Sequence, residues 1–453
     1  MTFAAKKGVF AARGDTALQS IEGFGFRPLA VIAWWSRQAS QGTERGNYGG
    51  IGFWTPDAST AVGWASEDGR TSTEAGSIAD SAAMLGLDGV DGAVGMRAEL
   101  ASFDADGLTL RWTVRPSAQW TAHFLALGGA PLKARVGCVS SPPSATATDL
   151  DLGAIRPELL LLVPTPAETG FRAEGLGIGI GAASGRRQAA AGYACPHGAP
   201  PGSVIGAQRD YSAVIALGSP EDPPTIGVLR RRGGRELAVE WSGAGQHAQR
   251  LSFLALEGVR AKVGTDVSTT APGRWRTRVG FRPEALLVFS WGLAASTRPK
   301  DIGRLCIGGS SRGETGCISW DDRDTKAQET MTHVASSTRQ ALVIADTQTG
   351  GTHAQAVLDS IDNSGFTLDW TKCDGKPREF AYVAIGRAES GNPAGRLRKW
   401  ITESWAGLSN ASTSLAAVHW RLTPISAIMS SWPPPPRPAP SAETRNGKRA
   451  QRS

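Results

Sequence analysis

The side chains that could do chemistry in this chain are few, and their spacing does not bring them together. None of the six histidines is paired with another four residues away or lies in an HExxH pattern. Cys195 and His197 are two potential metal ligands, but no second pair follows them at the spacing that a zinc site needs. We therefore interpret Cys195–His197 as part of a loop. The histidines are His123, His197, His247, His333, His353 and His419.

Acidic pairs and a glycine-rich run offer two further kinds of site. Glu67–Asp68 and Asp321–Asp322 fall in equivalent polar stretches and could bind a cation or a sugar, although a solvated turn is the commoner role of such pairs. Gly175–Gly181 resembles a phosphate-binding loop, but it lacks the Lys-Ser/Thr of a P-loop and no helix pattern follows it. The sequence predicts no catalytic, cofactor-binding or metal-binding residue, and we expect that the protein is not an enzyme.

Two tryptophans are the best candidates for contact with a ligand. Trp64 and Trp320 begin polar, weakly periodic stretches, Trp64–Ser77 and Trp320–Ser337, which we predict to be exposed loops. An exposed indole ring can stack on a sugar or pack against a protein partner. We therefore predict that these two side chains contact a partner or a glycan.

Other landmarks in the chain recur at a fixed spacing. Trp112, Trp241 and Trp370 each end a strand pattern and are 129 residues apart (241 − 112 and 370 − 241). Two sets of landmarks that keep register through three copies indicate a tandem array of three homologous domains. The tryptophans that close these strands are expected in the core. The second set follows about a dozen residues later with the same spacing: Phe124, Phe253 and Tyr382.

Each copy contains a similar series of strand patterns. An Arg-Pro pair precedes an apolar run, and proline suits the entry of a strand rather than its centre. A strand with alternating glycines follows, then a polar stretch, a core strand, a hairpin and a final strand. Seven or eight strands per copy predict a two-layer antiparallel β-sandwich of jelly-roll type. The prolines are Pro28, Pro157 and Pro283, and the glycine-rich strands are Gly49–Phe53, Leu176–Ile180 and Leu305–Gly308.

The predicted fold class is therefore all-β, with three tandem homologous antiparallel β-sandwich domains and an irregular C-terminal tail. The linkers Gly129–Arg135 and Gly258–Lys262 are short, so we expect neighbouring domains to be held against one another in a compact or arced array. We place repeat 1 at residues 1–131, repeat 2 at 132–259, repeat 3 at 260–390 and the tail at 391–453.

The tail differs in composition from the three repeats. It holds nine Lys and Arg residues against two acids, which accounts for the whole formal charge of +7. Because residues 1–390 are formally neutral, we expect nucleic-acid contact nowhere except through this tail. Its proline-rich run and basic end are typical of disordered chain, and residues 396–405 are able to form a short amphipathic helix. The candidate anchoring residues are Arg396, Arg398, Lys399, Trp400 and Trp405.

Cysteine usage and apolar runs restrict where the protein is expected to be found. The five cysteines are odd in number and do not recur at equivalent positions of the repeats, which favours free thiols over a disulfide framework. The N-terminus lacks the apolar region of a signal peptide, and no run approaches the roughly 20 apolar residues of a membrane span. We expect synthesis in a cytoplasm and no contact with a membrane.

The recurring motifs resemble a domain that is common in virion and tail structural proteins of tailed bacteriophages and prophages. The resemblance covers about residues 5–390 and excludes the tail. Repeat 3 matches nearly as well as repeat 1, whereas repeat 2 has Ala154-Ile155 in place of Gly-Phe and Arg230–Gly234 in place of the acidic turn. In repeat 1 the motifs are Gly25–Ala30, Gly50–Phe53, Ser102–Trp112 and Phe124–Gly128.

The resemblance implies a non-enzymatic structural or decoration component on the tail, collar or head surface of a phage or phage-like particle. Its partners would be other virion proteins in a symmetric assembly, and its location would be the virion, after synthesis in the cytoplasm of the bacterial host. The alternative is a lectin-like module of a phage tail that binds host-surface glycan through Trp64 and Trp320. An enzyme such as a tail depolymerase would need paired catalytic carboxylates, for which the sequence offers no candidate outside the repeats.

Overall fold

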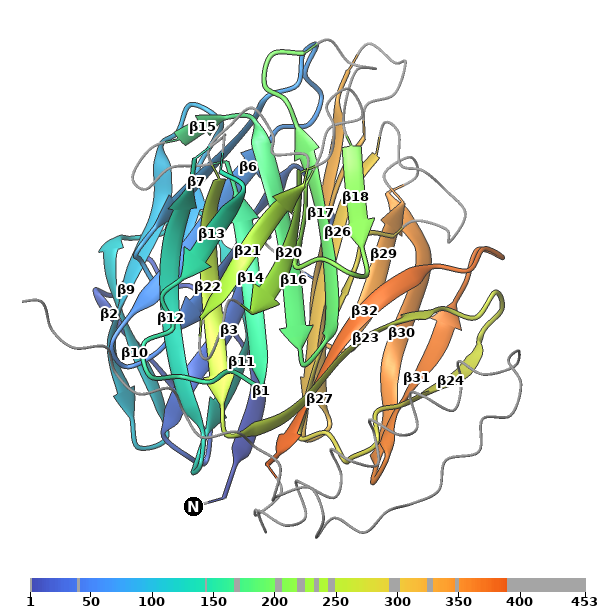
Figure 1. The fold of residues 1–453 in the computed structure, drawn as a ribbon. Coiled ribbons are helices and arrows are strands. Elements are labelled where there is room, and N and C mark those ends of the chain that lie inside the picture. The colour runs from blue at the N-terminus through green and yellow to red at the C-terminus, as the bar shows by residue number, and fades with distance from the viewer. Residues whose placement is uncertain are drawn as a thin grey trace, which may run out of the picture. The chain divides into compact units, whose positions relative to one another are not determined.

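A computed structural model of the chain shows β-strands and no helix in the part that it describes (Figure 1). The all-β class predicted from the sequence is confirmed. Residues Met1–Ser390 form one compact unit. The described residues are 2–38, 41–142, 145–166, 172–199, 206–217, 225–231, 236–242, 249–292, 302–323, 329–346 and 350–388.

Each repeat contains a six-stranded antiparallel sheet, and the strand order is the same in all three. We call these the inner sheets. In order of pairing they are β1 (Ala4–Ala11), β11 (Trp120–Gly128), β3 (Pro28–Arg37), β5 (Asn47–Trp54), β6 (Ser59–Ser66) and β7 (Ala75–Asp80) in repeat 1; β12 (Lys133–Ser141), β22 (Gln249–Glu257), β14 (Leu159–Thr165), β16 (Leu176–Ser184), β17 (Arg187–Cys195) and β18 (Gly206–Asp210) in repeat 2; and β23 (Val259–Val267), β32 (Glu379–Arg387), β25 (Ala285–Ser290), β26 (Ile302–Ser311), β27 (Glu314–Arg323) and β28 (Met331–Ser337) in repeat 3.

A four-stranded outer sheet packs on one face of each inner sheet, so each repeat is an antiparallel β-sandwich, as predicted. Burial alternates along outer strands such as β2, as expected where one face meets the core and the other meets water. The outer sheets are β2 (Leu18–Glu22), β10 (Gly107–Val114), β9 (Val94–Asp104) and β8 (Met84–Leu87); β13 (Ala147–Leu150), β21 (Leu237–Ser242), β20 (Thr225–Arg231) and β19 (Ile215–Leu217); and β24 (Gly273–Arg278), β31 (Gly365–Lys372), β30 (Gly351–Asp362) and β29 (Leu342–Asp346).

The inner sheets are also joined to one another at their edges. Strand β15 (Arg172–Glu174) of repeat 2 pairs with β7 of repeat 1, and β4 (Gly42–Arg45) of repeat 1 pairs with β28 of repeat 3. Repeat 2 meets repeat 3 through one parallel pair between β18 and β26. Each repeat is therefore hydrogen-bonded to both others, and strand edges that would otherwise be open to aggregation are covered.

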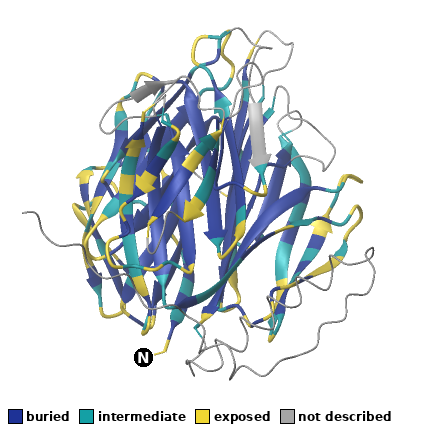
Figure 2. Cartoon of the chain, in the orientation of Figure 1, coloured by how far each residue is buried: buried dark blue, intermediate teal, exposed yellow. Residues whose placement is uncertain are grey.

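The second face of each inner sheet packs into one apolar core that all three repeats share. Because both faces are covered, strands such as β5 are buried along their whole length, and Figure 2 shows the central strands in dark blue. Equivalent positions supply equivalent side chains to this shared core. They include Ile32, Leu161 and Leu287; Ile51, Ile180 and Ile307; and Leu125, Leu254 and Val383, all at most 2% exposed.

The sequence prediction of seven or eight strands per repeat was too low, since each sandwich has ten strands in its two sheets. The missing strands lie in the polar stretches that were predicted to be exposed loops, Trp64–Ser77 and Trp320–Ser337. These stretches hold the ends of β6 and β27, the start of β7 and the whole of β28. Their small and polar residues show little periodicity because neighbouring repeats bury both of their faces.

Glycines in the glycine-rich strands allow the two layers of each sandwich to approach closely. Gly52, Gly181 and Gly308 occupy the same register in β5, β16 and β26. A Cβ atom at Gly181 or Gly308 would overlap a backbone carbonyl oxygen beside the outer sheet, whereas one at Gly52 would lie 2.7 Å from such an oxygen. The glycine alternation in the sequence therefore reflects contact between backbones.

Alanine substitutions at these three glycines should destabilise the protein in a fixed order. We expect Gly181→Ala and Gly308→Ala each to lower the unfolding free energy by about 1–3 kcal/mol, because the backbone must move to admit the methyl group. Gly52→Ala serves as the matched control and should cost less. Urea denaturation of the three variants measures this, and equal stability of Gly181→Ala and wild type would contradict the close approach.

Candidate functional site

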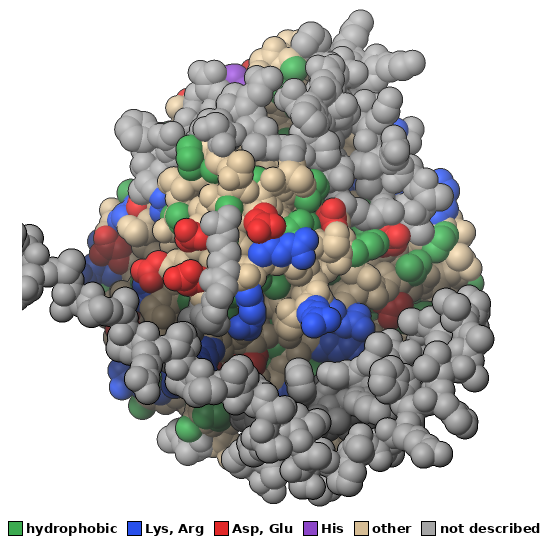
Figure 3. Space-filling view, in the orientation of Figure 1, with side chains coloured by type: hydrophobic (Ala, Val, Ile, Leu, Met, Phe, Trp, Pro, Cys, Tyr) green, Lys and Arg blue, Asp and Glu red, His purple; other side chains and the backbone are tan. Residues whose placement is uncertain are grey.

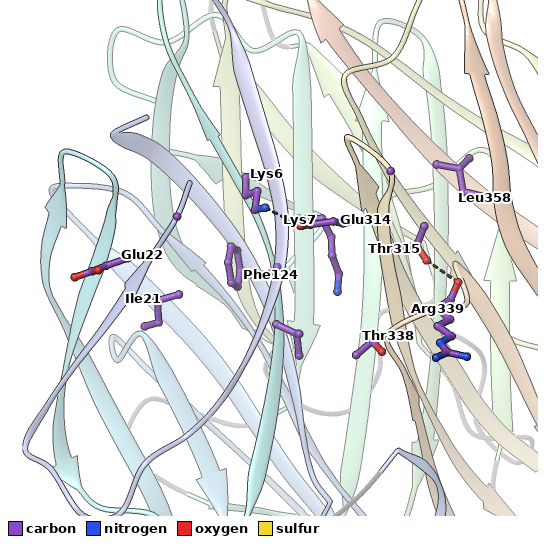
Figure 4. A pocket seen from close by; sticks show the side chains of 14 residues that line it. Lys6, Lys7, Ile21, Glu22, Phe124, Glu314, Thr315, Thr338, Arg339 and Leu358 are labelled. Atoms are coloured by element: carbon purple, nitrogen blue, oxygen red, sulfur yellow. Dashed lines mark hydrogen bonds and ion pairs between the residues drawn. The ribbon is translucent and has the colours of Figure 1, made fainter. Parts of the chain in front are cut away.

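The boundary between repeats 1 and 3, which we call the 1/3 seam, carries a groove. Its volume is about 600 Å³, and Figure 4 shows its side chains. Lys6 and Glu314 form an ion pair across it, with 2.7 Å between Nζ and Oε1. Phe124 and Ile21 supply apolar surface. The groove is thus a polar cleft between two repeats, and clefts are the usual sites of ligand binding.

A buried polar cluster lies beside this groove. The Nζ atom of Lys7 is 3.1 Å from Nδ1 of His123, and Nε2 of His123 is 3.3 Å from Oγ of Ser336. Lys7 is 2% exposed and His123 is fully buried, with its ring stacked on Trp34. Any side chain at Gly316 would overlap both Lys7 and His123. We call these three residues the Lys7–His123–Ser336 cluster.

The connectivity of this cluster resembles a Ser-His-Asp triad, but its polarity is the reverse. A protonated lysine can only donate, so Nδ1 of His123 must accept its hydrogen bond. The proton of the neutral imidazole then sits on Nε2 and is donated to Ser336. A general base needs a free lone pair on the nitrogen that faces the serine, so His123 cannot activate Ser336 in this state. The cluster is suited to holding the seam together and not to nucleophilic attack.

Burial shifts the pKa values of both bases in the cluster. Desolvation lowers the pKa of Lys7 from its ordinary 10.5 to about 8, although the neighbouring Cys317 and Glu314 oppose this shift. Desolvation, followed by the charge of Lys7, holds the pKa of His123 well below its usual value. His123 is therefore neutral in the folded protein. Because the unfolded chain binds a proton at His123 below about pH 6.5, acidification destabilises the fold through this residue.

A second polar cluster lies between the two sheets of repeat 3. Nε of Arg304 is 2.9 Å from Oδ2 of Asp321, and their side chains are 2% and 0% exposed. Nδ1 of His353 in β30 lies 3.3 Å from Oδ2 of Asp374, and Arg378 also pairs with Asp374. Burial raises the pKa of Asp321 to about 6 despite the Arg304 guanidinium. This resembles a tuned catalytic acid, but the buried carboxyl is closed to any substrate in this conformation.

Trp64 and Trp320 do not lie in exposed loops, so that prediction was wrong. They sit in β6 and β27, both side chains are 0% exposed, and their rings meet edge to face with centroids 5.0 Å apart. Asn47 accepts a hydrogen bond from Nε1 of Trp64 and donates one to the hydroxyl of Tyr193. Neither indole ring is available to a glycan in this arrangement, because the neighbouring repeats cover both.

Tyr193 is the equivalent of these tryptophans in repeat 2, and sequence reasoning missed it. It lies 129 residues after Trp64 (193 − 64), so the repeat spacing could have found it. Lys7 was missed as well. It occupies the strand position that Val136 and Val263 fill in the other repeats. Because valine is typical of buried positions, this equivalence could have indicated that Lys7 is buried.

Two other ligand candidates from the sequence, Asp68 and His197, serve as contacts between repeats. Oδ1 of Asp68 accepts a hydrogen bond of 2.8 Å from the backbone N–H of Thr332 in repeat 3. Nδ1 of His197 lies 3.4 Å from the backbone nitrogen of Ala75 in repeat 1. Asp321 and Asp322 are fully buried in β27 and are not in a loop, which corrects that prediction. No group of three or more His, Cys, Asp or Glu side chains arranged to hold a metal occurs among the described residues.

All five cysteines are free thiols, as the sequence predicted. The described segments contain no helix that is long and apolar enough to cross a membrane. The candidate anchoring residues lie outside the described residues: Arg396, Arg398, Lys399, Trp400 and Trp405. Comparison of the chain with protein families, curated proteins and solved structures finds no match.

Truncation of the Trp320 side chain should reveal its role in the core. We expect Trp320→Ala to lower the unfolding free energy by about 3–5 kcal/mol, because it empties a large volume in the shared core. Trp275→Ala is the control, since Trp275 is 40% exposed and should cost much less. Chemical denaturation measures both. A Trp320→Ala variant as stable as wild type would show that the ring does not pack as described.

Removal of Lys7 should change how stability depends on pH. Between pH 8 and 10 the unfolded chain holds a proton on this amine that the folded protein has lost, so stability rises with pH. We expect wild type to gain about 2 to 3 kcal/mol over Lys7→Met between pH 7 and pH 10. Urea midpoints at both pH values measure the gain. Val9→Met, on the same strand, should track wild type, and parallel pH profiles of wild type and Lys7→Met would refute the shift.

Proposed function

We propose that the protein is a non-enzymatic structural or decoration component of a phage or phage-like particle, on its tail, collar or head surface. It would act through protein–protein contacts. Support comes from the resemblance of its recurring motifs and from the way its polar residues are used. Most of the histidines, acids and tryptophans in the described repeats that could serve chemistry instead contact other residues within the compact unit.

The observation that carries the proposal is the ring of three sandwiches. Residues Met1–Ser390 place three inner sheets around one core and join each repeat to both others through strand pairs. Each outer sheet keeps one face toward solvent. A single chain of this kind presents three similar outward surfaces around an axis, which suits a position in a symmetric assembly.

The proposed partners are other virion proteins, and the proposed location is the virion, after synthesis in the cytoplasm of the bacterial host. The proposal includes no resident cofactor and no contact with a membrane. Contact with nucleic acid is proposed only through the basic tail at 391–453, whose positive charge is the whole formal excess of the chain.

Glycan binding is the second candidate function, and its candidate contact residue is Trp275, because Trp64 and Trp320 are buried. Trp275 is 40% exposed on the edge strand β24, between Arg274 and Arg276. An exposed indole ring offers an apolar face and a polar N–H group, both of which a sugar could contact. Saturable binding on a glycan array that Trp275→Ala abolishes would favour this function over the structural one.

The tail offers a direct test of the structural proposal. A chain that ends at Ser390 keeps the whole compact unit, so its melting temperature should match that of the full chain. If residues 391–453 anchor the protein, the shortened chain should not join particles in a co-purification assay. A chain that lacks only residues 446–453 separates the basic end from the rest of the tail. Normal incorporation of the chain ending at Ser390 would remove the anchoring role.

A further inference from the structure

A cation occupies the same place on the first strand of every inner sheet. Lys6, Arg135 and Lys262 pair with alanines 126, 255 and 384, which are 129 residues apart (255 − 126 and 384 − 255). The first two cations have acidic partners. Lys6 pairs with Glu314, as described above, and Arg135 pairs with Asp151. The third cation, Lys262, meets different surroundings.

The seam between repeats 2 and 3, which we call the 2/3 seam, repeats the contacts of the 1/3 seam. In the 1/3 seam, Oγ of Ser311 donates a hydrogen bond of 3.1 Å to the carbonyl oxygen of Ala5. In the 2/3 seam, Oγ of Ser184 donates one of 2.9 Å to the carbonyl oxygen of Ala261. Each serine thus bonds to the residue just before the cation, so the hairpin turn meets the first strand in the same way at both seams.

The residue that faces the cation has the opposite charge at the two seams. Ser311 pairs with Glu314 at the end of the β26–β27 hairpin, and Ser184 pairs with Arg187 at the end of the β16–β17 hairpin. Arg187 therefore takes the place of the acid, opposite Lys262. The pKa of Lys262 agrees with this placement, because burial and then the charge of Arg187 lower it.

The two cations keep hydrogen-bonding capacity for a ligand. Nζ of Lys262 donates 2.9 Å to the carbonyl oxygen of Arg278, which leaves two N–H groups. Arg187 is exposed and Lys262 half-buried, and within the described ranges neither forms an ion pair with an acid. Arg186 adds an exposed positive charge in the same turn. Figure 3 shows Lys and Arg side chains gathered near the middle of this face, where Figure 1 places the lower ends of β16 and β17.

We propose that Lys262 and Arg187 at the 2/3 seam form a binding site for a tetrahedral oxyanion, a phosphate or a sulfate. Two like charges held where an ion pair sits in the neighbouring seam repel each other, and a doubly charged anion between them removes that repulsion. The planar guanidinium offers a fork of donors and the ammonium a point charge, a combination that suits phosphate oxygens. The anion would bridge repeat 2 to repeat 3, as the Lys6–Glu314 pair bridges repeat 3 to repeat 1.

The test is thermal unfolding of the full chain with increasing inorganic phosphate, at ionic strength held constant with chloride. The wild type should show a saturable rise in melting temperature, because an anion that binds the folded state alone stabilises it. Arg187→Glu restores the charge pattern of the 1/3 seam. This variant should melt higher than wild type without phosphate, and its affinity for phosphate in calorimetry should fall at least ten-fold. Arg186→Glu has the same charge change in the same turn and should keep most of the response.

Introducing the same pair of cations at the 1/3 seam provides an independent test. Glu314→Arg places two cations opposite each other at the 1/3 seam, so it should lower the melting temperature and add a second phosphate-dependent rise. If Arg187→Glu folds poorly, Arg187→Gln removes the positive charge without adding a negative one. This variant should also lose the phosphate-dependent rise in melting temperature. Sulfate should replace phosphate and acetate should not. A wild type that phosphate stabilises no more than chloride, or an Arg187→Glu variant that keeps the full response, would overturn the site.

Discussion

The fold depends on the burial of the inner sheets on both faces. One face of each inner sheet packs on its own outer sheet, and the other enters the core that the three repeats share. Aliphatic side chains at equivalent positions, such as Ile51, Ile180 and Ile307, fill that shared core. Apolar burial on this scale is the main favourable term in folding, and here it requires all three repeats at once. This explains why residues Met1–Ser390 form one unit instead of three separate domains.

Three similar sandwiches in one chain raise a problem of specificity, because each could pack against the wrong neighbour. The three seams differ in the polarity of the side chains that they hold at equivalent positions. The 1/3 seam has the Lys7–His123–Ser336 cluster, and the 1/2 seam has a hydrogen bond of 2.7 Å between Thr60 and Ser252. Three of the equivalent positions in the 2/3 seam hold buried apolar side chains, Ala189, Val263 and Ala381. A lysine facing an apolar seam would lose its partner at a large desolvation cost. Buried polar groups of this kind favour one arrangement even where they add little stability.

The same use of polar groups bears on function. Residues that suggested ligand binding in the sequence, such as Asp68 and His197, hold one repeat to the next. Asp321 and His353, whose environments shift their pKa values strongly, lie between the layers of repeat 3. Among the described residues, the surface open to the proposed partners includes the outer sheets, the seam grooves and the charged turns. The proposed role in protein–protein contacts would use those features.

The sequence by itself determined the local structure of this protein. Proline before apolar runs, glycine alternation and the 129-residue spacing predicted most of the strands and a two-layer sandwich in each repeat, because these signals depend on neighbours within one repeat. They missed the strands in the polar stretches. Only the tertiary structure decided what the repeats do to one another. Trp64 and Trp320 stand in polar, weakly periodic sequence, and the burial that places them in the core comes from residues more than a hundred positions away. Lys7 and Arg187 likewise meet their neighbouring charges at seams between repeats. These contacts join residues far apart in the sequence, so no local pattern predicts which charges meet.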